Sequence, residues 1–290
     1  MNDDRLVEVY EVGPRDGLQN EASPIATIEK IALIDQLSLA GFRHIEAASF
    51  VSPKWVPQMA DGADVMASIA RRPGVSYAVL APNPQGYERA KACRPDEVAV
   101  FASASEGFSR NNINCSVAES FDRFAPVCAA AALDGVALRG YVSCVVACPF
   151  DGPVSPRQVA SVAFGLVAMG CREISLGDTI GAGTPETVAP MLKAVLERVE
   201  ASQIACHFHD TGGRALDCIA VALELGIRVF DASAGGAGGC PYAPGSPGNV
   251  ATGAVVDFLE ARGLRTCIDR DALAEAEATM HRLLGRVRAA

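Results

Sequence analysis

The chain has 290 residues, of which 50% are hydrophobic, and it carries a net charge of −9 with a pI of about 5.0. This acidic balance argues against nucleic acid as a partner, because phosphate binding needs a basic face. No apolar run approaches the ~18 residues of a membrane span, so we expect no membrane partner either. The ten cysteines are scattered without a Cys-x-x-Cys pair, which favours buried thiols and a cytoplasmic location over disulfides or a zinc ribbon.

Short, β-branched apolar segments alternate with longer helical patterns along the whole chain. One helical pattern covers residues 27–41 and ends at Gly41, as helices often do. Strand and helix repeated eight times predict an α/β fold, a closed (β/α)8 TIM barrel, with an open doubly wound sheet as the alternative. The predicted strands are residues 6–12, 44–49, 75–81, 97–103, 137–144, 172–178, 204–210 and 227–233.

No change in composition suggests an inter-domain linker. We therefore expect one TIM-barrel catalytic domain over residues 1–290, with the barrel itself in about 5–262. Residues 270–290 have the pattern of one more helix. We expect this C-terminal helix, at about 269–288, to pack outside the barrel.

Unusual polar residues follow the predicted strands. Active sites of such barrels lie at the carboxyl ends of the strands and in the loops that follow them. All of these residues fall on that side, so they are candidates for one site. They are Arg15 and Asp16 after the first strand, Glu46 and Ser49 on the second, Ser175 and Asp178 on the sixth, His207 and His209 on the seventh, and Cys240 and Asn249 after the eighth.

Two histidines two positions apart, His207 and His209, end the seventh predicted strand. Side chains at i and i+2 of a strand share a face, so both imidazoles point the same way. They could be core residues satisfied by neighbours, but each buried polar group left unpaired costs about 1–3 kcal/mol. With Asp16 and the amide of Asn249 they form a mixed nitrogen and oxygen set. This set favours a divalent metal, Mg²⁺ or Mn²⁺ rather than Zn²⁺.

Three other residues each have a structural and a functional interpretation. Arg15 could pair with Asp16 at the surface, but side chains at i and i+1 diverge, so we expect an inward anion clamp. Glu46 could equally be a strand-end partner in salt bridges. Cys240 could be an inert thiol, but it lies in a glycine-rich loop that could close over a site as a lid.

Six segments, in order, together resemble the 3-hydroxy-3-methylglutaryl-CoA lyase family, barrel metallolyases named for an Asp-Arg-Glu signature. They are "VGPRDGLQNE", "IEAASFVSPKWVPQMAD", "NNINCSVAES", "SLGDTIGAGTP", "CHFHDT" and "GGCPYAPGSPGNVAT". The resemblance implies metal ligands at Asp16, His207, His209 and Asn249. It implies catalytic roles for Arg15, Asp16, Glu46, His207 and Cys240, and substrate binding or site organisation by Arg15, Ser49, Ser175 and Asp178.

The resemblance further implies cleavage of 3-hydroxy-3-methylglutaryl-CoA (HMG-CoA) to acetyl-CoA and acetoacetate, with an acyl-CoA thioester as partner and a homodimer or larger homo-oligomer as the assembly. The segments "HDTGGRAL" and "APGSPGN" differ from the family's usual forms, which leaves open a sister lyase for a bulkier 3-alkyl substrate such as the isohexenyl one. A condensing enzyme of the same barrel group would carry a different first-strand motif and extra domains. A non-catalytic barrel that serves as a binding protein is the remaining alternative.

Overall fold

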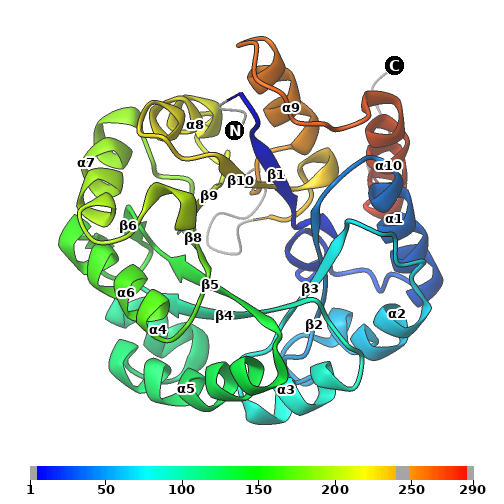
Figure 1. Ribbon diagram of the computed structural model, residues 1–290, viewed down its shortest axis with the longest axis horizontal. Coiled ribbons are helices and arrows are strands. Elements are labelled where there is room, and N and C mark those ends of the chain that lie inside the picture. Colours follow the sequence, from blue (N-terminus) through cyan, green and yellow to red (C-terminus); the bar gives the residue numbers. More distant parts are fainter. Residues whose placement is uncertain (1–4, 240–247, 286–290) are drawn as a thin grey trace.

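A computed structural model describes residues 5–239 and 248–285 of the chain. Eight parallel strands form a closed barrel in the order β1-β2-β3-β4-β5-β8-β9-β10, and β10 pairs with β1 to close it. Helices surround the barrel as an outer ring (Figure 1). The predicted TIM barrel is therefore confirmed, and the open-sheet alternative is wrong.

The barrel strands coincide with the eight predicted segments. Most of their residues are buried, as expected for parallel strands covered on both faces, which appear in sequence as nearly continuous apolar runs. Their bounds are β1 Glu8–Glu11, β2 His44–Ser49, β3 Ser76–Leu80, β4 Glu97–Ser103, β5 Ala137–Ser143, β8 Glu173–Asp178, β9 Ile204–Phe208 and β10 Val229–Ala232.

Helices connect the strands and bury their apolar stripes against the barrel. Leu33 of α1, Leu192 of α7 and Val255 of α9 are fully buried in the same continuous core. The chain turns out of α1 at Gly41, whose φ of 94° suits glycine. The helices are α1 Thr27–Leu39, α2 Gly62–Ser68, α3 Pro84–Lys91, α4 Glu106–Ile113, α5 Val117–Asp134, α6 Pro156–Ala168, α7 Pro185–Leu196, α8 Ala215–Glu224, α9 Thr252–Glu260 and α10 Arg270–Leu283.

The C-terminal helix α10 lies beside α1 on the outside of the barrel (Figure 1). This confirms the predicted extra helix. None of the helices in residues 5–239 and 248–285 is long and apolar enough to cross a membrane.

Several short elements were not predicted. A two-residue antiparallel ladder joins β6 Ala147–Cys148 to β7 Gly152–Pro153. Gly13–Gly17 form a π-helical turn, η1, directly after β1. Three 3₁₀ turns, η2 Pro57–Met59, η3 Ala201–Gln203 and η4 Ala234–Gly236, lie in the connections between longer elements. The turns η1 and η4 matter for function because they follow β1 and β10 at the carboxyl end of the barrel.

Candidate active site and metal centre

A cleft of about 790 Å³ opens at the carboxyl ends of the strands. This volume lies within the ~300–1,000 Å³ of typical ligand pockets. Its lining combines charged and polar side chains with apolar ones. Arg15, Asp16, His207 and His209 are among the first group, and Leu80, Phe101 and Phe108 among the second.

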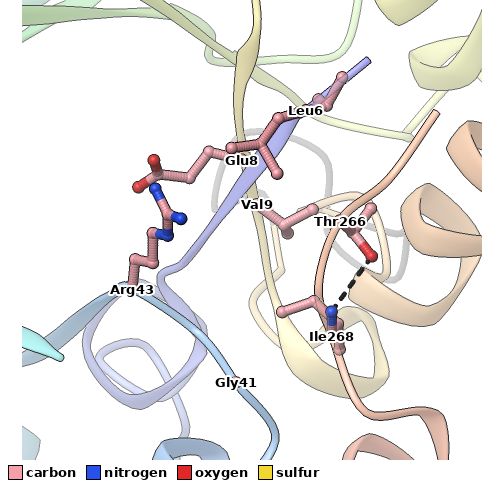
Figure 2. A pocket seen from close by; sticks show the side chains of 8 residues that line it. Leu6, Glu8, Val9, Gly41, Arg43, Thr266 and Ile268 are labelled. Carbon is pink, nitrogen blue, oxygen red and sulfur yellow. Dashed lines mark hydrogen bonds between the residues drawn. The ribbon is translucent and has the colours of Figure 1, made fainter. Parts of the chain in front are cut away.

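A second cavity lies near the start of β1, among Leu6, Glu8, Val9, Gly41, Arg43, Thr266 and Ile268 (Figure 2). Its volume is about 10 Å³, room for about one water molecule. Figure 2 also shows the Ile268 amide donating to Thr266 Oγ1, which closes one side. This cavity is too small for a substrate, so the chemistry belongs to the cleft.

Three of the predicted metal ligands converge in the cleft. Asp16, His207 and His209 each offer a ligand atom, and these atoms all lie within 4.8 Å of one another. The fourth, Asn249, is brought to the same place, because its Nδ2 donates to Asp16 Oδ2 at 2.8 Å. Asp16 follows β1, His207 and His209 lie at the end of β9, and Asn249 follows β10. Closure of the barrel, which pairs β1 with β10, brings them together.

The protonation states and free atoms of this group suit a metal ion. Arg15 and both histidines lower the pKa of Asp16 although burial opposes them, which keeps the carboxylate ionised. Burial, reinforced by His207, lowers the pKa of His209 to about 4, so its imidazole is neutral, the form that binds metals. Nδ1 of His209 is buried and has no hydrogen-bond partner among the described residues. A divalent cation fits this donor set.

His207 is oriented from behind. Its Nδ1 lies 3.2 Å from Oδ2 of Asp231, and its Nε2 faces Asp16 Oδ2 at 3.9 Å. Burial opposes ionisation of Asp231, but Arg139 and His207 hold its pKa well below the usual range, so the ionised carboxylate can accept a hydrogen bond from Nδ1–H of His207. This carboxylate–histidine arrangement is the one that commonly orients a metal-binding imidazole.

The turn η1 places Arg15 beside Asp16. The amides of Arg15, Asp16 and Gly17 all bond to the Val12 carbonyl, at 3.2, 2.8 and 3.2 Å. This tight winding brings Arg15 Nη1 to within 2.8 Å of Asp16 Oδ1. The expectation that these neighbouring side chains diverge is therefore wrong. The inward orientation of Arg15 is nevertheless observed, since its side chain is buried and lines the cleft.

Arg15 is held as a cation by two carboxylates. Its Nη2 lies 2.6 Å from Glu46 Oε2, and Tyr141 Oη donates to the same oxygen at 2.9 Å. Burial would lower the pKa of Arg15, but Glu46 and Asp16 raise it above its ordinary value. Glu46 is fully buried. Its contacts match the salt-bridge interpretation, and its partner in the salt bridge is Arg15, which lines the cleft.

The remaining predicted site residues have other contacts. Ser175 Oγ donates to Asp231 Oδ2 at 2.7 Å, and Asp178 accepts from the amides of Ala182 and Gly183 at 3.1 and 2.7 Å. Ser49 Oγ accepts from the Val51 amide at 3.3 Å. Within the described residues, none of these three lines the cleft. Cys240 lies outside the residues that the structure describes.

Sequence reasoning missed the buried charges below the cleft. Arg139 of β5 bonds to Asp231 of β10 through Nη1 and Nη2, at 3.1 and 2.6 Å, and donates to Tyr141 Oη at 2.8 Å. Arg139 and Asp231 are each the single charged residue of their observed strands, β5 and β10. These isolated charges could have been noticed in the sequence, but the local sequence does not show that the two residues pair across the barrel.

Comparison with known proteins identifies the family of this chain. A sequence model of the HMGL-like family matches residues 6–280. A Pseudomonas aeruginosa 3-hydroxy-3-isohexenylglutaryl-CoA/hydroxymethylglutaryl-CoA lyase is 53% identical over 99% of this chain and 95% of its own. An HMG-CoA lyase structure from Brucella melitensis superposes with a TM-score of 0.95 at 59% identity, covering 96% of this chain and 99% of that one.

A further solved structure is an HMG-CoA lyase from Acinetobacter baumannii in complex with coenzyme A and 3-methylmalate. It has a TM-score of 0.93 and 38% identity, and covers 99% of this chain and 95% of that one. The resemblance seen in the sequence motifs is thus confirmed over almost the whole length: the chain belongs to the 3-hydroxy-3-methylglutaryl-CoA lyase family.

Proposed function

We propose that the protein is a metal-dependent carbon–carbon lyase that cleaves HMG-CoA into acetyl-CoA and acetoacetate. The observation that carries the proposal is the convergence of Asp16, His207 and His209 beside the buried cation of Arg15, inside one cleft. The names of the relatives support the substrate. The coenzyme A bound by the Acinetobacter protein supports an acyl-CoA thioester as the ligand.

The reaction has three requirements. The tertiary hydroxyl loses its proton, the carbon–carbon bond breaks to give a ketone and a thioester enolate, and the enolate carbon gains a proton. A bound divalent cation supplies Lewis acidity and orientation for the hydroxyl and the distal carboxylate. Asp16, His207, His209 and Asn249 would hold this cation.

Arg15 is suited to the second step. Its guanidinium remains charged, is fixed by Glu46 and Asp16, and lines the cleft. A fixed donor aimed at the thioester oxygen stabilises the charge that develops there, an effect of about 3–4 kcal/mol for a single donor. Because Arg15 is buried, this interaction is stronger than it would be in solution.

Proton transfers need a base and an acid. Asp16 and His207 are the candidates for the base that takes the hydroxyl proton, and both lie at the metal site. Asp231 fixes the His207 ring, so one imidazole nitrogen always faces Asp16. We assign the protonation of the enolate carbon to the Cys240 thiol, which with an ordinary pKa of about 8.5 is mostly protonated at neutral pH.

The test is a cleavage assay of the full chain with HMG-CoA. Acetyl-CoA and acetoacetate should form in equal amounts with Mg²⁺ or Mn²⁺ and should cease to form after chelation. Zn²⁺ is the comparison ion, and restored activity on adding back Mg²⁺ excludes loss of folding. A protein that binds HMG-CoA but releases neither product under any ion would instead be a non-catalytic barrel.

A second substrate class has its own support. The apolar side chains Leu80, Phe101 and Phe108 line the same cleft as the metal residues. A longer 3-alkyl branch could lie against them, and the Pseudomonas relative is named for both an isohexenyl and a methyl substrate. Comparing kcat/KM for the methyl and a longer-alkyl substrate, each with and without Mg²⁺, separates the two activities.

The other expectations remain part of the proposal. Nine of the ten cysteines are free thiols in the described residues, which supports a reducing cytoplasm. We keep one catalytic domain over residues 1–290 and a homodimer or larger homo-oligomer. Sedimentation of the purified chain measures the assembly directly.

A further inference from the structure

Residues 233–235, which follow β10, lie side by side with residues 250–253 at the rim of the barrel, and we call these two short segments the neck. The Ser233 amide donates to the Val250 carbonyl at 3.1 Å, and the Thr252 amide donates to the Ser233 carbonyl at 3.0 Å. Asn249 stands just inside this neck, next to Val250. Together with the bonds of Gly248 and Val250 to Asp210 and Phe208, the position of the neck sets where the Asn249 amide lies relative to Asp16.

Glu11 cross-links the neck from the barrel side. This residue ends β1, is fully buried, and accepts from the Ala234 amide at 2.9 Å and from Thr252 Oγ1 at 2.7 Å. The same oxygen that receives Ala234 also receives the Gly13 amide, at 2.8 Å. One carboxylate thus joins both sides of the neck to the turn that carries Arg15 and Asp16.

Glu277 of α10 cross-links the next residue pair from outside the barrel. Its Oε1 accepts from the Gly235 amide at 3.3 Å and from the Gly253 amide at 3.0 Å. The pair 235 and 253 directly follows the pair 234 and 252 held by Glu11. Two acidic side chains, one internal and one from the C-terminal helix, therefore form successive cross-links across the neck.

The two glycines leave the space that α10 occupies. A Cβ at Gly253 would lie 2.9 Å from Glu277 Oε1, and one at Gly235 would lie 2.7 Å from His281 Nε2. Gly235 also has a φ of 62° and its carbonyl lies 3.3 Å from that same His281 nitrogen. The neck is shaped around α10 rather than merely covered by it.

We propose that Glu277 is a positioning residue of the active site. By holding Gly235 and Gly253 together it fixes the neck that presents Asn249 to Asp16, His207 and His209. The C-terminal helix then helps to position the metal ligands, in addition to covering the outside of the barrel. The inference rests on the proposed metal-dependent function. It adds that a residue outside the barrel, Glu277, helps to position a metal ligand.

The test compares Glu277→Ala with Glu277→Gln and with Glu275→Ala, an exposed acidic residue of the same helix. Disturbing a group that orients a ligand costs about 10–100-fold in metal affinity or activity, so Glu277→Ala should weaken Mn²⁺ binding about tenfold. Its kcat should fall similarly, with a smaller change in KM, and amide exchange should speed up at residues 249–253. Glu277→Gln should stay near wild type, because one amide oxygen can accept both bonds, and Glu275→Ala should match wild type.

Gly253→Ala provides a second route, since the added methyl displaces the Glu277 carboxylate without removing it; it should also weaken Mn²⁺ binding. Unchanged Mn²⁺ affinity and kcat in folded Glu277→Ala would mean that Glu277 only fastens the helix, and the inference would be lost. Equal defects in Glu277→Gln and Glu277→Ala would also overturn it. A wild-type chain inactive on HMG-CoA would refute the proposed function, whereas Mn²⁺ affinity and amide exchange would still test the neck.

Discussion

The middle of the barrel and its carboxyl-end rim both bury charge, but they satisfy it differently. In the middle, Arg139 and Asp231 are fully buried and bonded to each other, and Arg139 Nε also reaches Glu173 at 2.8 Å. On the rim, Arg15 Nε and Glu46 Oε1 are buried without a hydrogen-bond partner in the described part of the chain. A buried polar atom left unpaired costs about 1–3 kcal/mol.

The difference distinguishes charged residues that stabilise the fold from charged residues that are placed to bind a ligand. The middle network completes its own bonds, so it can stabilise one arrangement of the strands. The rim keeps unsatisfied atoms, including Nδ1 of His209, next to a cleft of about 790 Å³. The comparison predicts that substitutions in the middle reduce stability, whereas those on the rim reduce turnover.

The largest effect is expected in the middle. Arg139→Met removes the cationic partner of the buried Asp231 carboxylate, which keeps only its contacts with Ser175 and His207. Breaking such a buried ion pair costs about 3–5 kcal/mol of unfolding free energy. Urea unfolding followed by circular dichroism measures the loss. A variant as stable as wild type would show that the middle network does not stabilise the fold.

On the rim, Arg15→Gln should lower kcat by about 10²–10³, because one donor to the developing enolate is removed. The glutamine amide can still donate to Glu46, so the fold and the metal should be retained. Steady-state kinetics with parallel metal analysis decides the matter. Near-normal turnover would remove Arg15 from the mechanism.

Asp231 belongs to both regions, because it pairs with Arg139 below and with His207 above. Asp231→Asn should weaken Mn²⁺ binding by about 10–100-fold, since the His207 ring loses the carboxylate that orients it. Calorimetric titration measures this affinity. Ser175→Ala removes a different bond to Asp231 and serves as the matched control, with a smaller loss expected.

The smallest effect is a pH dependence in the middle. Burial raises the pKa of Glu97 to about 7, although Arg139 and the Tyr10 hydroxyl oppose the rise. The folded chain binds this proton more tightly than the unfolded chain does. Glu97 therefore stabilises the fold most below pH 4.5, and this stabilisation is lost as the pH rises towards 7. Between pH 5 and 7 the loss is about 2 kcal/mol.

Glu97→Gln should remove this contribution while keeping an acceptor for Tyr10, whose hydroxyl lies 2.6 Å from the carboxylate. Denaturant unfolding of both proteins at several pH values gives the comparison. The same pH slope in the variant and the wild type would assign the effect to other groups.

Local sequence patterns predicted the barrel because each strand is a short apolar run followed by a helix, and they placed His207 and His209 on one face. They could not reveal the β6–β7 ladder, whose two-residue strands are too short for any period. The contact between Arg15 and Asp16 depends on the π-helical winding of η1, which has no sequence signature of its own. Contacts such as Arg139 with Asp231 join residues 92 positions apart, so only the closed barrel reveals them.

The central claim is that Asp16, His207, His209 and Asn249 on the rim hold one divalent cation. Mn²⁺ titration of the full chain, followed by elemental analysis, tests it most directly, with His207→Ala and His209→Ala as comparison variants. We expect one ion per chain in the wild type and none retained by either variant. A wild type that binds no ion, or variants that keep their full metal content, would contradict the account.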